Sequence, residues 1–376
     1  MTHVFIVDKI TFKYHLEYMF AGTGAKDKQA IFLTNHTVPN DKKSFPSVTE
    51  RNLVAMIADI SRVKVGDKII FYLQSTSESS GMFFGVFQAI SNPFFDENDD
   101  KNYLKSELKK GLSFRVLIAP DQVFSLGATE RELLDNIADK KYPYQLCWSL
   151  IYRKLKGNRG CTMITDYEYE ELYNKLSLLN SGKTLNFSNY TYDSKQNAIV
   201  EANSTKKYMG RQNSIDIEPR MRYKAQRRGI AFETHLQAYV VRQIVEKNAS
   251  LLEKLGINPN QDFWIGNEVS CGVGMQRIDV MIIQEVGNNV VNIIPIELKD
   301  EEPTDKIFNQ ISLYMDWIRQ YVEPNYRDRG KTVKINPFVI APKTTNSLIE
   351  NKMTSDGIGY VSIELANNQF VFNRLN

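Results

Sequence analysis

Apolar and β-branched residues in the first third of the chain come in short runs that Gly, Pro, Asn and Asp interrupt. This pattern predicts short strands separated by turns over residues 4–124. The clearest strands are predicted within residues 63–73, 81–90 and 114–118, the first two as a hairpin. Apolar residues at helical spacing predict helices over 49–62 and 129–137. The simplest assembly of these elements is a small β-barrel decorated with helices.

The chain after residue 220 alternates between helical and strand patterns. A long helix is predicted from about 225 to 255 and a shorter helix over 305–321. Strands are predicted over 262–269, 277–284, 290–298 and 336–340. Mixed order of this kind indicates an α/β core in which helices flank a mixed sheet.

Residues 180–210 are rich in Asn, Ser, Thr and Lys and contain few apolar residues, which is typical of a linker. The length of 376 residues also predicts two domains, each with its own core. We therefore predict a two-domain α+β or α/β protein. Its parts are an N-terminal domain over 1–180, a basic linker over 181–220 and a C-terminal domain over 221–376.

Composition excludes several classes of protein. With 42% hydrophobic and 24% charged residues, the chain is neither collagen-like nor disordered. The net charge of +3 is too small to indicate a polyanionic partner by itself. Its 3 cysteines form no CxxC pair, so neither a disulfide framework nor a thiolate zinc site is expected. We see no signal peptide and no apolar run of membrane-spanning length, and expect a cytoplasmic protein without membrane contact.

Charged residues stand at unusual places in two of the predicted strands. Glu297 and Lys299 are two positions apart, so both project from one face of the strand that ends there. Asp279 interrupts the apolar run of the preceding strand, where a carboxylate is costly unless it is paired or binds a metal. The separation between Asp279 and Glu297 allows two adjacent antiparallel strands.

Helical residues bring further polar groups to the same region. Glu233 falls in the apolar stripe of the long helix through its spacing to Leu236 and Val240, so it should face inward. On the helix after the second acid, Gln310 and Tyr314 are four residues apart and lie on one face.

Hydrolysis of a phosphodiester explains why these residue types would converge. Two carboxylates, a backbone carbonyl and phosphate oxygens form a suitable open shell for Mg²⁺, and Mn²⁺ should substitute. Asp279 and Glu297 are then the metal ligands. Lys299 orients the attacking water and holds the scissile phosphate. Glu233 holds a second metal or the waters of the first.

This arrangement resembles the PD-(D/E)XK nuclease superfamily over residues 221–342. The superfamily carries an acid on one strand and an acid, an apolar residue and lysine on the next, matched here by Asp279 and by Glu297-Leu298-Lys299. Its glutamate on the preceding helix and glutamine on the following one are matched by Glu233 and Gln310. The resemblance implies a restriction-endonuclease-like fold in which these five residues are catalytic, although no Pro precedes Asp279. The alternative is a core acid at Glu233, a strand-edge residue at Asp279 and a surface ion pair between Glu297 and Lys299.

The strings at 65–73 and 81–87 resemble the PUA-like group that includes EVE and YTH domains. A Pro-containing turn at 91–96 follows, as is common there. The resemblance implies a small barrel that often binds a flipped or modified base in an aromatic pocket. Most aromatic residues of these strings should nevertheless be ordinary core.

Two basic stretches are candidates for DNA contact. The first combines aromatic and basic residues that would place phosphate clamps beside a stacking surface. Its candidates are Trp148, Tyr152, Arg153, Lys154 and Arg159. The second stretch, residues 206–228, precedes the acidic helix and includes Arg222, Arg227 and Arg228. It is either a DNA-backbone contact or a solvated tether.

These observations together predict a Mg²⁺-dependent DNA endonuclease of the restriction type. The N-terminal domain would recognise double-stranded DNA, with a modified cytosine as one candidate feature, and the C-terminal domain would cut it. Cutting both strands favours a homodimer. The alternatives are a restriction enzyme specific for an unmodified sequence, a non-catalytic nucleic-acid-binding protein and a structure-selective repair nuclease.

Overall fold

The computed structural model describes residues 1–24, 47–77, 79–96, 103–135, 139–150, 160–204, 206–228, 233–271, 276–287 and 289–376. The chain divides into two compact units. Unit 1 comprises Met1–Lys141 and Gln145–Asp216, and unit 2 comprises Tyr142–Tyr144 and Ile217–Asn376. A 3₁₀ helix, η2, spans Pro143–Leu146.

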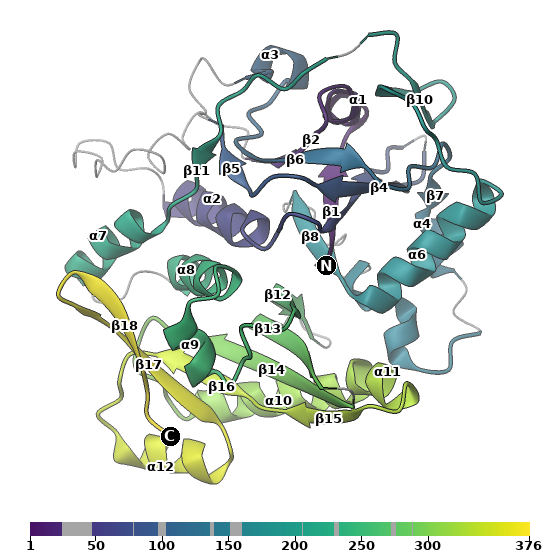
Figure 1. Cartoon of the computed structure of the whole chain (residues 1–376). Coiled ribbons are helices and arrows are strands. Elements are labelled where there is room, and N and C mark those ends of the chain that lie inside the picture. Colours follow the sequence, from purple (N-terminus) through teal and green to yellow (C-terminus); the bar gives the residue numbers. More distant parts are fainter. Residues whose placement is uncertain are drawn as a thin grey trace. The chain divides into compact units, whose positions relative to one another are not determined.

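The described residues of unit 1 form a curled nine-stranded sheet with helices around it (Figure 1). The strand order is β11-β5-β6-β4-β3-β1-β8, and β2 and β7 pair with β6 and β4. The strands are β1 (Thr2–Val7), β2 (Phe20–Thr23), β3 (Lys68–Leu73), β4 (Met82–Ala89), β5 (Phe94–Phe95), β6 (Phe114–Pro120), β7 (Ala128–Thr129), β8 (Cys161–Ile164) and β11 (Asn213–Ser214). The helices are α1 (Lys9–Glu17), α2 (Ser47–Ile60), α3 (Lys105–Leu108), α4 (Glu130–Leu134) and α6 (Asp166–Leu179).

The predicted hairpin of unit 1 is confirmed. Strands β3 and β4 pair antiparallel, with Leu73 opposite Met82. Their aromatic side chains form the core, as expected: Phe71, Phe84 and Phe87 are completely buried, and the Phe12 ring of α1 packs 5.1 Å from that of Phe84. The short apolar runs between turn residues were therefore sufficient to place these strands.

Most of the stretch predicted as a basic linker, 181–220, belongs to unit 1, which extends to Asp216. It contains an antiparallel hairpin of β9 (Tyr190–Asp193) and β10 (Ala198–Glu201), followed by β11. Tyr190 and Tyr192 are buried, and the Tyr192 ring packs 5.0 Å from that of Phe12. Two tyrosines on one face of a short strand attach this polar segment to the core.

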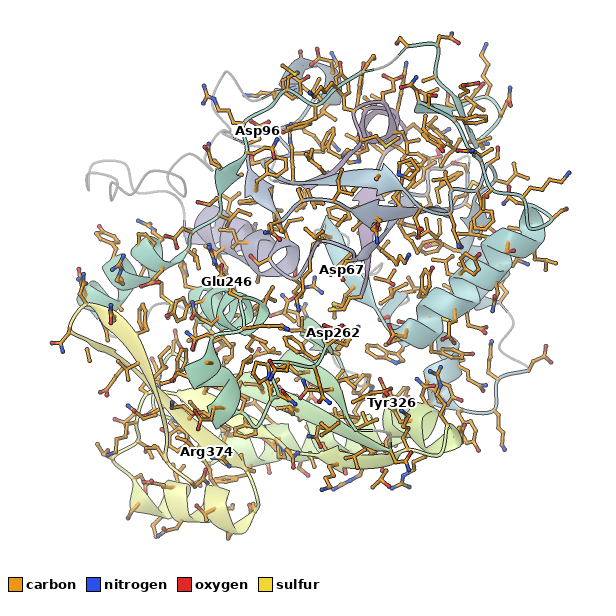
Figure 2. All side chains as sticks on the ribbon, in the orientation of Figure 1. Asp67, Asp96, Glu246, Asp262, Tyr326 and Arg374 are labelled. Atoms are coloured by element: carbon orange, nitrogen blue, oxygen red, sulfur yellow. The ribbon has the colours of Figure 1, made fainter. Side chains whose placement is uncertain are left out.

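A buried ion pair connects three segments of unit 1. Arg115 of β6 lies 2.7 Å from Asp96 and donates a hydrogen bond to the hydroxyl of Tyr208, and all three side chains are buried. Figure 2 labels Asp96 in its place after β5. Because Arg115 also donates to the carbonyls of Leu112 and Tyr103, its guanidinium has polar partners on several sides.

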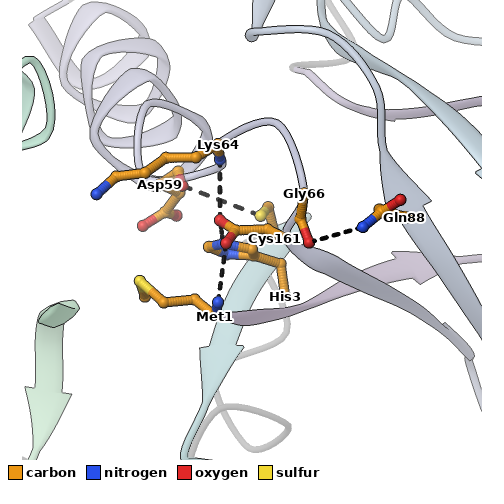
Figure 3. A network of polar contacts seen from close by, with 8 residues as sticks. Met1, His3, Asp59, Lys64, Gly66, Gln88 and Cys161 are labelled. Atoms are coloured by element: carbon orange, nitrogen blue, oxygen red, sulfur yellow. Dashed lines mark hydrogen bonds and ion pairs between the residues drawn. The ribbon is translucent and has the colours of Figure 1, made fainter. Parts of the chain in front are cut away.

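A second polar network connects the start of β1 to the turn before β3 (Figure 3). The Asp67 carboxylate accepts hydrogen bonds from the Met1 amine at 2.8 Å, from His3 Nε2 at 2.9 Å and from the Lys64 amide at 2.9 Å. Burial by itself would raise the pKa of Asp67, but His3 and the amine lower it to about 2. The carboxylate therefore remains charged and keeps β1 beside β3.

Unit 2 contains a seven-stranded mixed sheet in its described residues, with strand order β12-β13-β14-β16-β17-β18 and β15 paired with β14. The strands are β12 (Phe263–Ser270), β13 (Arg277–Val286), β14 (Val290–Leu298), β15 (Thr332–Ile335), β16 (Phe338–Ala341), β17 (Gly359–Ala366) and β18 (Gln369–Arg374). The helices are α7 (Glu218–Arg228), α8 (Glu233–Val245), α9 (Ala249–Lys254), α10 (Lys306–Tyr321), α11 (Glu323–Asp328) and α12 (Ser347–Ser355). The mixed α+β character that we predicted is confirmed.

Boundaries in unit 2 agree with the predicted strands and differ for one helix. The strand predicted over 290–298 is β14, and those predicted over 262–269 and 277–284 are β12 and β13. The continuous helix predicted from 225 to 255 is wrong, because three helices occupy this region. Lys247 has a positive φ of 57°, and the Asn248 side chain caps α9, so the helical path ends and restarts there.

Helix α12 and strands β17 and β18 were not predicted. Strand β17 pairs in parallel with β16, and β18 returns antiparallel to β17 at the sheet edge (Figure 1). Among the described residues, no helix has the length and apolar character that crossing a membrane requires.

The buried ion pair of unit 1 gives a stability prediction. Arg115→Met leaves Asp96 buried without its cation, so we expect a loss of about 3–5 kcal/mol in the free energy of unfolding. Hydrogen exchange of β6 peptides at increasing urea concentration measures this for unit 1 alone. Arg131→Met is the control, because Arg131 is exposed and its change should be within about 0.5 kcal/mol. An equal loss in both variants would contradict the prediction.

Candidate active site

Three carboxylates stand at one level across the first three strands of unit 2. Val280 pairs with Ile296 on β14, so the next position places Asp279 opposite Glu297. On the other side, β12 and β13 pair at Asn267–Val280 and at Val269–Ile278, so Glu268 is level with Asp279. The predicted proximity of Asp279 and Glu297 follows from this register.

Asp279 is buried in the middle strand of the three. Its neighbours in sequence, Ile278 and Val280, have no exposed surface and belong to the apolar core. Its Oδ2 accepts a hydrogen bond from the backbone amide of Leu298 at 2.8 Å. This bond fixes the carboxyl group beside the residue that follows Glu297.

Glu297 is 2% exposed and is held by two side chains. Lys299 Nζ donates to its Oε1 at 2.5 Å, and the hydroxyl of Tyr314 donates to its Oε2 at 2.7 Å. The Tyr314 hydroxyl also lies 2.8 Å from the carbonyl oxygen of Arg277. Helix α10 therefore contacts both β13 and β14. Both oxygens of Glu297 are therefore fixed in direction.

Glu233 begins α8, and its Oε2 lies 3.8 Å from Lys299 Nζ. Its side chain is 46% exposed, so it borders the site from the solvent side. The inward orientation predicted for Glu233 is therefore wrong. Gln310 is half-buried on α10, one turn before Tyr314. Tyr314, rather than Gln310, is the α10 side chain that reaches the acids.

The site carries more negative charge than Lys299 neutralises. Burial raises the pKa of Asp279 well above its usual range, and the charges of Glu297 and Glu233 add to this. Burial also raises the pKa of Glu233, although Lys299 opposes the shift. Burial would lower the pKa of Lys299, but Glu297 and Glu233 raise it, so the lysine stays protonated. A cation would relieve the repulsion among the acids.

The predicted metal ligands fit this need in part. Asp279 and Glu297 offer hard oxygen donors at one level of two paired strands, as an open Mg²⁺ site requires. Within the part of the chain that the structure describes, no group of three or more His, Cys, Asp or Glu side chains could hold a metal ion. Two protein carboxylates completed by water or phosphate oxygens therefore describe the site better than a cage that includes Glu233.

Of the candidate DNA-contact residues of unit 1, only Trp148 lies among the described residues. Trp148 is 4% exposed, so its indole is a buried core group and not the exposed stacking surface that we predicted. The stretch 151–159, with Tyr152, Arg153, Lys154 and Arg159, lies outside the described residues.

The candidates of the second basic stretch lie on α7. Arg222 Nε is 3.9 Å from Glu218, and its Nη1 donates to the carbonyl of Asn368 on the β17–β18 turn at 3.4 Å. Arg227 and Arg228 end α7, and their side chains lie outside the described residues. DNA contact by these arginines stays a prediction.

Sequence reasoning missed three residues beside the acids: Gln237, Glu268 and Arg277. Gln237 Nε2 donates to the carbonyl of Asp279 at 3.0 Å and to Glu268 Oε1 at 3.2 Å, and Arg277 pairs with Glu268. Their only sequence signal was position. Gln237 is one turn after Glu233, and Glu268 becomes level with Asp279 once the hairpin register is known.

Comparison with known proteins identifies no family. No protein-family model and no curated protein sequence matches the chain. Similar solved structures include human THYN1 in complex with DNA containing 5-methylcytosine, at 10% identity, covering 47% of this chain and 96% of that one, with a TM-score of 0.26. The DUF55 domain of human thymocyte nuclear protein 1 gives 14%, 36%, 77% and 0.23 for the same quantities. A protein from Pseudomonas putida gives 14%, 46%, 98% and 0.26. At these TM-scores the likeness assigns neither a fold nor an activity.

The charge excess of the site predicts that removing one acid stabilises the metal-free chain. Asp279→Asn keeps an oxygen for the Leu298 amide and removes the repulsion, so the urea midpoint of unit 2 should rise at pH 7. Because the folded pKa of Asp279 is raised above 3.8, the wild type loses stability as pH increases from that value through the folded pKa. The advantage of the variant should therefore disappear at about pH 4 and below.

Asp316→Asn is the control for this measurement, because Asp316 is exposed on α10 in the same unit. It should change the midpoint little at either pH. A fall in stability for Asp279→Asn at pH 7 would show that the acids do not repel one another as the register implies.

Proposed function

We propose that the chain is a metal-dependent deoxyribonuclease that hydrolyses phosphodiester bonds in duplex DNA. The observation that carries the proposal is the meeting of Asp279 and Glu297 across β13 and β14, with Lys299 on the second acid. Two buried like charges are costly, and a structural role does not require them. The match with the PD-(D/E)XK pattern, residue by residue, supports the same activity.

Each residue has a role in this reaction. Asp279 and Glu297 would hold Mg²⁺ or Mn²⁺, which supplies a bound water of lowered pKa and stabilises charge on the phosphate. Lys299 is protonated and would orient the attacking water and contact the scissile phosphate. Tyr314 fixes the direction of Glu297. Glu233 would accept a hydrogen bond from the waters at the exposed side.

Unit 1 would recognise the DNA. Its β3–β4 hairpin carries the strings that resemble PUA-like domains, and the two strands pair antiparallel. On this basis we propose recognition of a modified base, with modified cytosine as the first candidate. The basic residues of α7 would contact the backbone, and a homodimer would supply one site for each strand.

Removing either reactive group should abolish cleavage. We expect Glu297→Gln and Lys299→Ala to lower the rate of plasmid cleavage in Mg²⁺ by about 100-fold or more, because the first removes the charge of a metal ligand and the second removes the cation at the phosphate. DNA affinity measured without metal should change little. Glu285→Gln and Lys331→Ala are matched controls, since this ion pair lies in the same sheet away from the acids. Full activity in Glu297→Gln and Lys299→Ala would exclude the assignment.

A comparison of substrates tests the role of unit 1. One plasmid prepared in unmodified, cytosine-methylated and hydroxymethylated forms should be cut at different rates, with the modified forms preferred. Equal cutting of all forms would instead support an enzyme for an unmodified sequence. Binding without cutting in Mg²⁺ and Mn²⁺ would support a non-catalytic nucleic-acid-binding protein.

A further inference from the structure

The ladder between β12 and β13 is interrupted beside Asp279. Residues on both sides pair regularly, at Asn267–Val280 and Val269–Ile278, whereas Glu268 and Asp279 are level but form no pair. Glu268 has a φ of 50°, which side-chain-bearing residues rarely adopt. Such strain persists only where the surroundings enforce it, and it gathers at functional sites.

Gln237 occupies the interruption. Its side chain is buried, and its amide nitrogen donates to the carbonyl of Asp279 at 3.0 Å and to Glu268 Oε1 at 3.2 Å. The helix thus supplies a hydrogen bond to the Asp279 carbonyl at the level where the strand pairing is interrupted. Both protons of the amide are used, so the side chain has one preferred setting.

Arg277 completes the arrangement at the start of β13. Its guanidinium pairs with Glu268 Oε2, while its backbone carbonyl lies 2.8 Å from the Tyr314 hydroxyl. Glu268 therefore accepts from Gln237 with one oxygen and pairs with Arg277 through the other. The negative charge of Glu268 is therefore compensated by Arg277 and not by Lys299.

The position of Gln237 on α8 gives this contact a consequence for the site. Gln237 follows Glu233 by four residues, so the two lie on one face of the helix. A bond from Gln237 to the Asp279 backbone fixes the height and rotation of α8 against β13. It thereby also fixes the distance from Glu233 to Lys299, which is 3.8 Å.

We propose that Gln237 is a positioning residue of the acidic site, held in place by Glu268 and Arg277. It keeps the Asp279 carboxyl at the Leu298 amide and Glu233 beside Lys299. As a catalytic contribution this rests on the proposed nuclease function. As a statement about how Asp279 is held, it does not.

Gln237→Leu tests the proposal, because it retains bulk and helix propensity but donates no hydrogen bond. Gln243→Leu is the matched control: Gln243 lies on the same helix and accepts from Asn248 at 2.6 Å, away from the acids. Amide hydrogen exchange is measured at Leu298, whose N–H binds the Asp279 carboxyl, and at Ile283, further along the same strands. Plasmid cleavage and Mn²⁺ affinity by calorimetry are measured in parallel.

We expect Gln237→Leu to speed exchange at Leu298 by about tenfold and to weaken Mn²⁺ binding and cleavage by about 10- to 100-fold, as loss of supporting contacts around a metal site does. Exchange at Ile283, and all readouts in Gln243→Leu, should stay near the wild type. Unchanged exchange at Leu298, or equal acceleration at Ile283, would overturn the proposal.

Two further outcomes are decided by the same design. If the wild-type chain neither binds Mn²⁺ nor cuts DNA, the proposed nuclease function is wrong. Exchange at Leu298 would still test whether Gln237 positions Asp279. Should Gln237→Leu fail to fold, Glu268→Ala and Glu268→Gln replace it. The Ala variant removes the acceptor and should behave as described for Gln237→Leu, while the Gln variant keeps an acceptor oxygen and should restore slow exchange at Leu298. Equal exchange in both Glu268 variants would contradict the proposal.

Discussion

The arrangement of unit 2 depends on holding two buried carboxylates level on adjacent strands. Asp279 and Glu297 repel one another, and burial deprives both of water. The surrounding contacts answer this repulsion: an amide at Leu298, the ammonium of Lys299 and the hydroxyl of Tyr314. Leu298 ends β14, Lys299 follows it and Tyr314 lies on α10. The same contacts therefore constrain both the packing of α10 and the register of β13 with β14.

The local part of this arrangement could be predicted from the sequence, because it depends on one hairpin. Strands β13 and β14 carry the apolar runs 280–283 and 293–296 next to their acids, and the short connection between the strands fixes the pairing. The roles of Gln237 and Glu268 could not be predicted, since they need the register of β12 and the rotation of α8. Neither quantity is encoded in a periodic pattern. The break near Lys247 was missed for a similar reason. In the sequence, the capping residue Asn248 cannot be distinguished from a polar residue on the exposed face of a continuous helix.

In unit 1, local composition was a poor guide to structure. The polar stretch after residue 180 has the composition of a linker, yet the buried Tyr190, Tyr192 and Ile199 attach it to the core as a hairpin. Trp148 failed as a stacking candidate because a large aromatic side chain beside basic residues is as easily a core group. Strands β1 and β3 pair in parallel although they are far apart in sequence, and no local pattern predicts this pairing.

The two buried acids make unit 2 less stable than apolar residues at the same positions would. A pair of apolar residues at positions 279 and 297 would pack in the same strands without repulsion, and replacing buried charges in this way is often neutral or stabilising. The lysine, the tyrosine and the Leu298 amide all reduce a penalty that such a core would not have. Structural demand therefore does not account for this group of residues. The metal-dependent reaction that we propose would account for it, since the same repulsion that destabilises the pair of acids would become attraction for a cation.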